Sequence, residues 1–212
     1  MRLVGMLDSP YVRRVAVSLQ LLGLPFTHES VSVFRQFDGF AAINPGVKAP
    51  TLVCDDGEVL MESTLILDHA ETLAAGRRSL MPAAPLERQH ALRAISLALA
   101  ACEKAVQIIY EQNLRPVEKQ HAPWVERVGG QMLAALDALE RETAHRPPPT
   151  AGAALDQAAV TSAVVWHFIG QMSVAALAPP ERFPSLAALG AECEALPAFR
   201  AAPHGDGVYP VR

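Results

Sequence analysis

The stretch TLVCDDGEVLMESTLILDHAETL, residues 51–73 of a chain of 212, decides the fold that the sequence predicts. Two short apolar runs flank Asp56-Gly57, and Asp-Gly between apolar runs is a strong signal for a hairpin of antiparallel strands. From Ser63 to Leu73 apolar residues return at helical spacing, so we expect a helix that begins at Glu62 or Ser63. The inner face of this helix is expected to carry Leu65, Ile66, His69 and Ala70.

The residues before the hairpin predict a strand, a helix and a second strand. Residues 2–7 and 26–33 read as short strands, and residues 10–22 carry apolar side chains at helical spacing. This order favours a parallel pair of strands with a right-handed crossover. Residues 34–48 are expected to be a loop with at most a short helix. Residues 1–75 therefore have the element order of a thioredoxin-like domain.

The strand signals stop after residue 75. A linker with one glycine and two prolines is expected at residues 76–85. Long Ala- and Leu-rich helical patterns follow, with a Pro- and Gly-rich tail that we expect to be an irregular strap. The helices are expected at 86–114, 122–145, 153–172 and 185–195, and the strap at 197–212. Strands followed by helices predict a two-domain α+β chain, with residues 86–212 as an all-helical domain.

Composition argues against several functions. The net charge is −4 and the basic residues are scattered, so we expect no nucleic-acid partner. The sequence shows no apolar run of membrane-spanning length and no signal peptide, so we expect a cytoplasmic protein without a membrane. The three cysteines lie far apart without a CxxC pair and the seven histidines are dispersed, so we expect neither disulfides nor a metal site.

The start of the first helix holds an unusual charge pattern. Ser9-Pro10 is a typical helix start, and Arg13 and Arg14 follow it without any acid before Glu29. A helix N-terminus already carries partial positive charge, so this pattern indicates a bound anion. By helical angle both arginines cannot face that anion. We expect at least one to be a solvated surface charge and Arg13 to be the contributor. On local sequence alone, an ordinary N-cap is the better interpretation of Ser9.

Three segments together resemble the glutathione transferases, over essentially the whole chain. They are SPYVRRVAVSLQLLGLPF (9–26), NPGVKAPTLVCDDGEVLMESTLILDHAE (44–71) and FPSLAALGAECEALPAFRAAP (183–203). The similarity is to cytosolic-type bacterial members with serine at the active-site position. Asp156 stands where the family has a buried helix-capping Asp. Ala153 replaces the Ser or Thr usual three residues earlier, so the capping box is incomplete.

The resemblance implies a glutathione transferase fold, namely a thioredoxin-like domain with strand order 2-1-3-4 followed by a helical bundle. It also implies glutathione as cosubstrate, no tightly bound cofactor, and a homodimer that pairs through residues 65–73 and the helix from Leu86. The implied catalytic residue is Ser9, whose hydroxyl would stabilise the glutathione thiolate. A free thiol has a pKa of about 8.5, and a helix N-terminus with a hydroxyl donor lowers it.

The remaining glutathione-binding residues are also assigned by the resemblance. A cis Ala49-Pro50 bond would expose the main chain of Ala49 to the cysteinyl part of the tripeptide, in strand-like pairing. Lys48 is either a surface lysine or a partner of the glycine carboxylate. Glu62 would bind the γ-glutamyl ammonium, and Ser63 with the helix N-terminus its carboxylate. The alternative for this pair is a simple helix start.

A second-substrate pocket is expected between the domains. Its candidate residues are Tyr11, Phe34, Val106, Tyr110 and Trp166, with His167 beside them. Aromatic residues at helical spacing are also typical of an ordinary core. The predicted function is attack of the thiolate on a small hydrophobic electrophile, a peroxide or a disulfide. The alternatives are a non-catalytic binding or regulatory protein of the same fold, and a glutaredoxin-like reductase, against which the absence of cysteine at position 9 argues.

Overall fold

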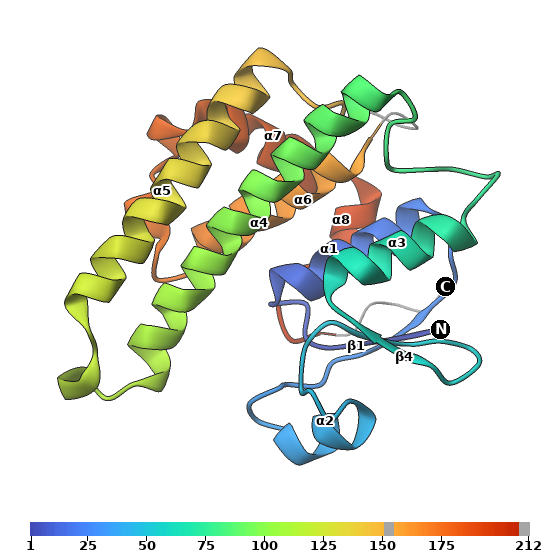
Figure 1. The fold of residues 1–212 in the computed structure, drawn as a ribbon, viewed down its shortest axis with the longest axis horizontal. Coiled ribbons are helices and arrows are strands. Elements are labelled where there is room, and N and C mark those ends of the chain that lie inside the picture. The colour runs from blue at the N-terminus through green and yellow to red at the C-terminus, as the bar shows by residue number, and fades with distance from the viewer. Residues whose placement is uncertain (151–154, 208–212) are drawn as a thin grey trace. The chain divides into compact units, whose positions relative to one another are not determined.

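The computed structural model describes residues 1–150 and 155–207 (Figure 1). The chain divides into two compact units. The first contains residues 1–80 together with the described C-terminal residues 195–207, and the second contains residues 81–194. The sequence-based boundaries placed the whole C-terminal segment in the helical domain. The structure groups it with the N-terminal unit, because Arg13 donates a hydrogen bond to the carbonyl of Ala202.

The first unit is built on a four-stranded sheet of order β2-β1-β3-β4. β1 (Arg2–Val4) pairs in parallel with β2 (Thr27–Glu29) and antiparallel with β3 (Thr51–Val53), which pairs antiparallel with β4 (Val59–Met61). The helices are α1 (Pro10–Leu21), α2 (Phe37–Ile43), α3 (Ser63–Leu73) and the short α8 (Pro197–Ala201). The predicted fold class and strand order are confirmed.

Helices α1 and α3 pack side by side over the sheet, and α8 packs on α1. Their shared core includes Leu3, Val15, Leu19, Leu52 and Ile66, all fully buried. Burying this apolar surface is the main force that holds short strands together.

The two parallel strands are shorter than predicted, for local reasons. Gly5 has φ +134°, which turns the chain out of β1, and its N–H bonds to the carbonyl of Glu29. The N–H of Val31 then bonds back to Glu29, a tight turn that ends β2.

Two expectations about helices of this unit are wrong. Leu65 is 64% exposed and Leu67 takes its place on the inner face of α3, because the helix rotates Ile66, Leu67 and Ala70 toward the sheet. The tail is not wholly irregular, since α8 lies within it. Residues 208–212 of the expected strap lie outside the described residues.

The second unit is a helical bundle of α4 (Pro85–Leu114), α5 (Ala122–His145), α6 (Gln157–Gln171) and α7 (Pro184–Glu194). Short 3-10 turns occur at η1 (Val117–Lys119), η3 (Ala175–Leu177) and η4 (Pro180–Arg182). α6 is buried along most of its length and packs against α4 and α7, while α5 packs against α4. The predicted bounds of α5 are confirmed.

Helix α6 begins later than predicted, at Gln157. Asp156 is its N-cap, and the Asp156 carboxylate accepts a hydrogen bond from the Ala159 N–H at 2.8 Å. The expected capping role of Asp156 is confirmed, whereas Ala153 lies outside the described residues. In the described part of the chain no single helix is long and apolar enough to cross a membrane. Only α6 followed by Ala175–Arg182, bent by 109°, has the length and composition of a broken span.

Candidate functional site

The turn between β1 and α1 brings two predicted site elements together, the loop of Ala49 and the start of α1. A Cβ on Gly5 would lie 2.7 Å from a Val12 methyl and 3.0 Å from the Ala49 Cβ, so only glycine allows this approach. The loop that carries Ala49 therefore lies directly beside the first turn of α1. This is the end of the helix where Ser9 stands.

Ser9 is the N-cap of α1. Its Oγ accepts the Val12 N–H at 3.4 Å, a long contact, and Pro10 occupies the first helical position. The ordinary capping role is thus present, but it uses only a lone pair of the hydroxyl. The O–H of Ser9 can still donate to an anion, and no acidic residue occupies the first turn of α1.

Both arginines of α1 are buried, each about 1% exposed, so the expectation of a solvated arginine is wrong. The Arg13 Nε donates to the Ala202 carbonyl at 2.7 Å, and its guanidinium lies 5.7 Å from the centre of the Phe199 ring. These contacts attach the C-terminal segment to the first unit. Burial is tolerated because α1 packs between α3 and α8, which supply acceptors on both sides.

Arg14, rather than Arg13, contacts a predicted site residue. Its guanidinium donates to the Ser63 Oγ at 3.1 Å and to the Thr64 Oγ1 at 3.4 Å. A buried positive charge therefore lies against the N-terminus of α3. It adds to the partial positive charge that this helix end already carries.

Glu62 has an unusual backbone conformation. Its φ is +74° and its ψ 117°, a region that side-chain-bearing residues rarely adopt. Its carboxylate accepts the Thr64 N–H at 3.2 Å with each oxygen and the Leu65 N–H at 3.3 Å. Such backbone strain is concentrated at ligand-binding positions in proteins. Glu62 is partly exposed, whereas Ser63 beside it is 1% exposed and held by Arg14.

The Ala49-Pro50 peptide bond is cis, as the resemblance implied. The loop before it is fixed by two buried polar residues that sequence reasoning missed. The Asn44 Nδ2 donates to the Thr51 Oγ1 at 2.8 Å, and that hydroxyl donates to the Lys48 carbonyl at 2.8 Å. Lys48 itself is exposed and Ala49 partly exposed. Their roles toward glutathione stay predictions.

A charged cluster next to Ser9 was also missed. Burial raises the pKa of Asp8, and the nearby charge of His204 partly opposes this rise. The C-terminal segment that carries His204 is held by the Ser30 Oγ, which donates to the Asp206 carbonyl at 2.7 Å. Asp8 precedes Ser9 directly and could have been considered, but nothing in the sequence links it to a histidine so far along the chain.

The candidates for a second-substrate pocket are divided between the units. Tyr11 and Phe34 belong to the first, and Val106, Tyr110 and Trp166 to the second, so the pocket stays a prediction. Trp166 lies against Gly190, where a Cβ would come within 2.7 Å of its ring. Together with His167 it lines a cavity of about 320 Å³ whose other residues come from α6, α7 and the chain between them. Among residues 1–150 and 155–207 no group of three or more His, Cys, Asp or Glu could hold a metal ion.

Comparison with known proteins identifies relatives of this chain. Residues 3–78 match the family "Glutathione S-transferase, N-terminal domain". An uncharacterised GST-like protein of Escherichia coli is 29% identical over 140 residues, 66% of this chain and 68% of that protein.

Two solved structures are similar along almost the whole chain. A glutathione S-transferase of Methylobacterium radiotolerans, in complex with glutathione sulfonate, is 27% identical with a TM-score of 0.84 over 95% of this chain and 93% of that one. A glutathione transferase family member of Pseudomonas fluorescens with bound glutathione is also 27% identical, with a TM-score of 0.79 over 95% and 97% of the two chains.

Proposed function

Because residues 3–78 form a glutathione S-transferase N-terminal domain and the chain has the glutathione transferase fold, we propose that this protein is a Ser-type glutathione transferase. It binds glutathione in its first unit and activates the thiol for attack on a small hydrophobic electrophile or a peroxide. Glutathione bound in related structures supports the cosubstrate.

The observation that carries the proposal is the contact between the N-terminal halves of α1 and α3. Arg14 on α1 bonds to Ser63 at the start of α3, and Glu62 is held beside it in a strained conformation. The N-terminus of α3 and a buried guanidinium form a binding place for a carboxylate. The adjacent Glu62 carboxylate suits an ammonium. A free amino-acid end carries both groups, as the γ-glutamyl end of glutathione does.

Activation of the thiol falls to Ser9. Its hydroxyl donates to the sulfur once the proton has left, and the N-terminus of α1 stabilises the same negative charge. Asp8 lies beside it, and burial raises the pKa of this carboxyl. We assign the main chain of Ala49 to the cysteinyl backbone of glutathione, and Lys48 to its glycine carboxylate.

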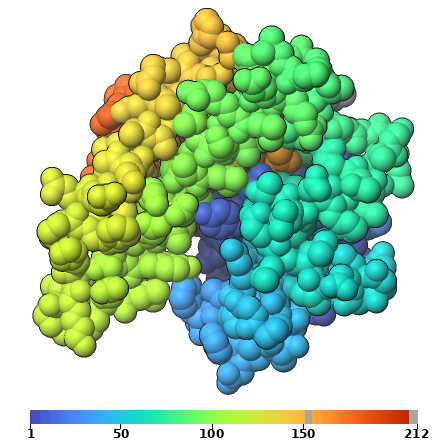
Figure 2. Space-filling model, viewed as in Figure 1, coloured from blue at the N-terminus to red at the C-terminus, as the bar shows by residue number. Residues whose placement is uncertain are grey.

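The proposal includes a homodimer. Leu65 and Leu73 on α3 are 64% and 41% exposed, and Leu86 and Leu92 on α4 are 66% and 51% exposed. In Figure 2 the side chains of α3 (blue-green) and, in the other unit, of α4 (green) reach the visible surface. These exposed leucines are candidates for the interface, since a large exposed apolar surface marks an interaction site. We also place the protein in the cytoplasm, since all three cysteines are free thiols.

The test is retention on immobilised glutathione, followed by turnover assays with an aryl halide, an epoxide and a hydroperoxide. We expect retention and turnover of at least one substrate class, and loss of turnover but not of retention in Ser9→Ala. Retention without any turnover would favour a non-catalytic binding protein. In such a protein Ser9 would act only as the N-cap of α1, a role that its contact with the Val12 N–H already fills. No retention would contradict the proposal.

A further inference from the structure

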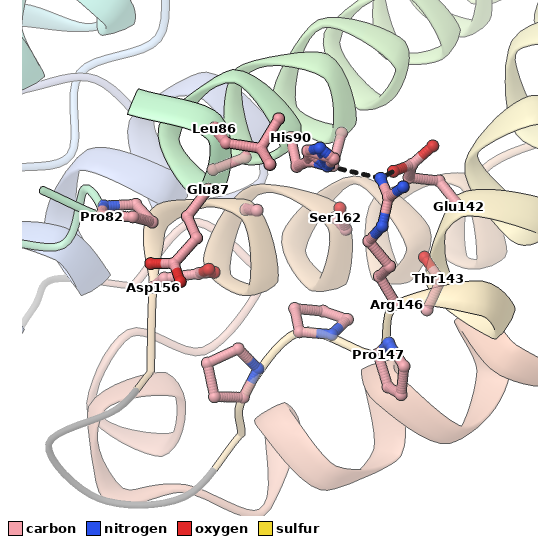
Figure 3. A pocket seen from close by; sticks show the side chains of 15 residues that line it. Pro82, Leu86, Glu87, His90, Glu142, Thr143, Arg146, Pro147, Asp156 and Ser162 are labelled. Carbon is pink, nitrogen blue, oxygen red and sulfur yellow. Dashed lines mark hydrogen bonds and ion pairs between the residues drawn. The ribbon is translucent and has the colours of Figure 1, made fainter. Parts of the chain in front are cut away.

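The second unit contains a cavity that the proposed reaction does not use. It has a volume of about 430 Å³ and lies between the start of α4, the end of α5 and the start of α6 (Figure 3). All of its lining residues belong to the second unit, whereas Ser9, Glu62 and Ser63 belong to the first. Its volume is within the range of small-molecule sites in proteins, roughly 300–1,000 Å³.

The cavity exists because small side chains line it where helices meet. Ala91 and Ala94 on α4 face Ala158 and Ser162 on α6, and Ala91, Ala158 and Ser162 are buried. Larger residues at these positions would fill the space between the helices. The proline rings of residues 147–149 also line the cavity, and Pro147 is labelled in Figure 3. Rigid apolar walls of this kind form a preformed site rather than a gap that collapses.

The charged groups at one end of the cavity bind one another. Arg146 donates to the Nδ1 of His90 and to the Glu142 Oε1 at 2.9 Å. The second Glu142 oxygen accepts from the Arg93 Nε at 3.3 Å. The Glu142 carboxylate is therefore shared by two arginines, and this end does not require a charged ligand.

The opposite end is different. Glu87 and Asp156 project there, away from Arg146 (Figure 3). The Asp156 carboxylate accepts the Ala159 N–H, and burial raises the pKa of this side chain. Within the described parts of the chain no cation forms an ion pair with either carboxylate. Two negative charges thus border an apolar space without a countercharge.

We propose that this cavity binds an organic ammonium cation with a compact apolar or aromatic body. The ammonium would lie between Glu87 and Asp156, and the apolar body against the alanines and prolines. An anion would be repelled by two carboxylates that form no ion pair, and a neutral molecule would gain no charge-assisted contact with them. The expected ligands are therefore amines of about the size of benzylamine or somewhat larger.

The test compares three probes of one shape: benzylamine, benzyl alcohol and benzoate. Binding to the full chain is measured by ligand-observed NMR and calorimetry at neutral pH. We expect benzylamine to bind about tenfold more tightly than benzyl alcohol, the effect of one charge-assisted contact, and benzoate not to bind. Glu87 is exposed, so the variant Glu87→Gln should fold normally. This variant should lose most of the preference for benzylamine over benzyl alcohol.

Two further variants locate the binding site. Ala94→Leu should fill the cavity and abolish benzylamine binding, whereas the matched control Ala188→Leu on the exposed side of α7 should not. Glutathione affinity should be unchanged in all three variants, so this test is independent of the proposed function. Equal binding of benzylamine and benzyl alcohol, or benzylamine binding that survives Ala94→Leu, would overturn the proposal.

Discussion

Replacing Glu62 by glycine and by alanine separates its structural role from its role in binding. Both changes remove the carboxylate that caps α3 through the N–H groups of Thr64 and Leu65. Loss of a side-chain cap costs about 1 kcal/mol of stability. Alanine keeps the strain of a φ of +74°, whereas glycine relieves about 1–2 kcal/mol of that strain. Part of this gain is offset because glycine increases the conformational entropy of the unfolded chain.

The free energy of unfolding should therefore fall by about 1 kcal/mol in Glu62→Ala and stay close to the wild-type value in Glu62→Gly. Glutathione affinity should fall in both variants by about 1–3 kcal/mol, because both lose the charge that faces the ammonium. The assays are urea unfolding and isothermal titration calorimetry. The glycine variant is the informative one, since it combines near-normal stability with weak binding.

Glu58→Ala is the matched control. Glu58 is an exposed acid of the neighbouring hairpin, so its removal changes the net charge equally without touching α3. It should affect neither stability nor binding. Wild-type affinity in Glu62→Gly would refute the binding role of Glu62. A glycine variant no more stable than the alanine variant would refute the argument from backbone strain.

Four further predictions concern other contacts. Ser63→Ala should weaken glutathione binding by about 1–3 kcal/mol in calorimetry, and unchanged affinity would leave Ser63 as a helix start. Arg14→Lys, which keeps the charge but loses the forked donor, should weaken the same binding and lower the unfolding midpoint. Burial raises the pKa of Asp156, so the folded protein holds the proton of this carboxyl more tightly than the unfolded chain does. The stability that this proton contributes is lost as the pH rises through the folded-state pKa. Asp156→Asn keeps a capping side chain and should remove this slope from urea unfolding as the pH rises above about 4, the usual pKa of the carboxyl. Parallel pH profiles of the two proteins would contradict this role. Light scattering at micromolar concentration should give twice the chain mass of 22.7 kDa, and a monomer in Leu65→Glu.

Local signals in the sequence were sufficient for several helices. The bounds of α3 (Ser63–Leu73) and α5 (Ala122–His145) match their predictions, because periodicity and end residues agree there. The strand order and the cis Ala49-Pro50 bond came from the family resemblance, and the structure has both. These features are either local or carried by a motif.

Features that depend on distant parts of the chain were not predictable. The burial of Arg13 requires the carbonyl of Ala202, 189 residues away. Likewise α7 is capped from another helix, where Glu140 of α5 accepts the Ser185 and Leu186 N–H groups at 2.8 and 2.9 Å. The positive φ of Glu62 was also invisible, since glutamate gives no sequence signal for it. Tertiary packing sets all three.

The most direct test of the central claim is an ultraviolet titration of the glutathione thiol bound to the wild type and to Ser9→Ala. We predict that the wild type lowers the thiol pKa by about two units from roughly 8.5, the equivalent of about 2.7 kcal/mol in favour of the thiolate. Ser9→Ala should raise that pKa while glutathione affinity stays within a small factor, because the hydroxyl acts only on the anion. An identical pKa in the two proteins would contradict the role of Ser9, and an unperturbed thiol in the wild type would contradict the account as a whole.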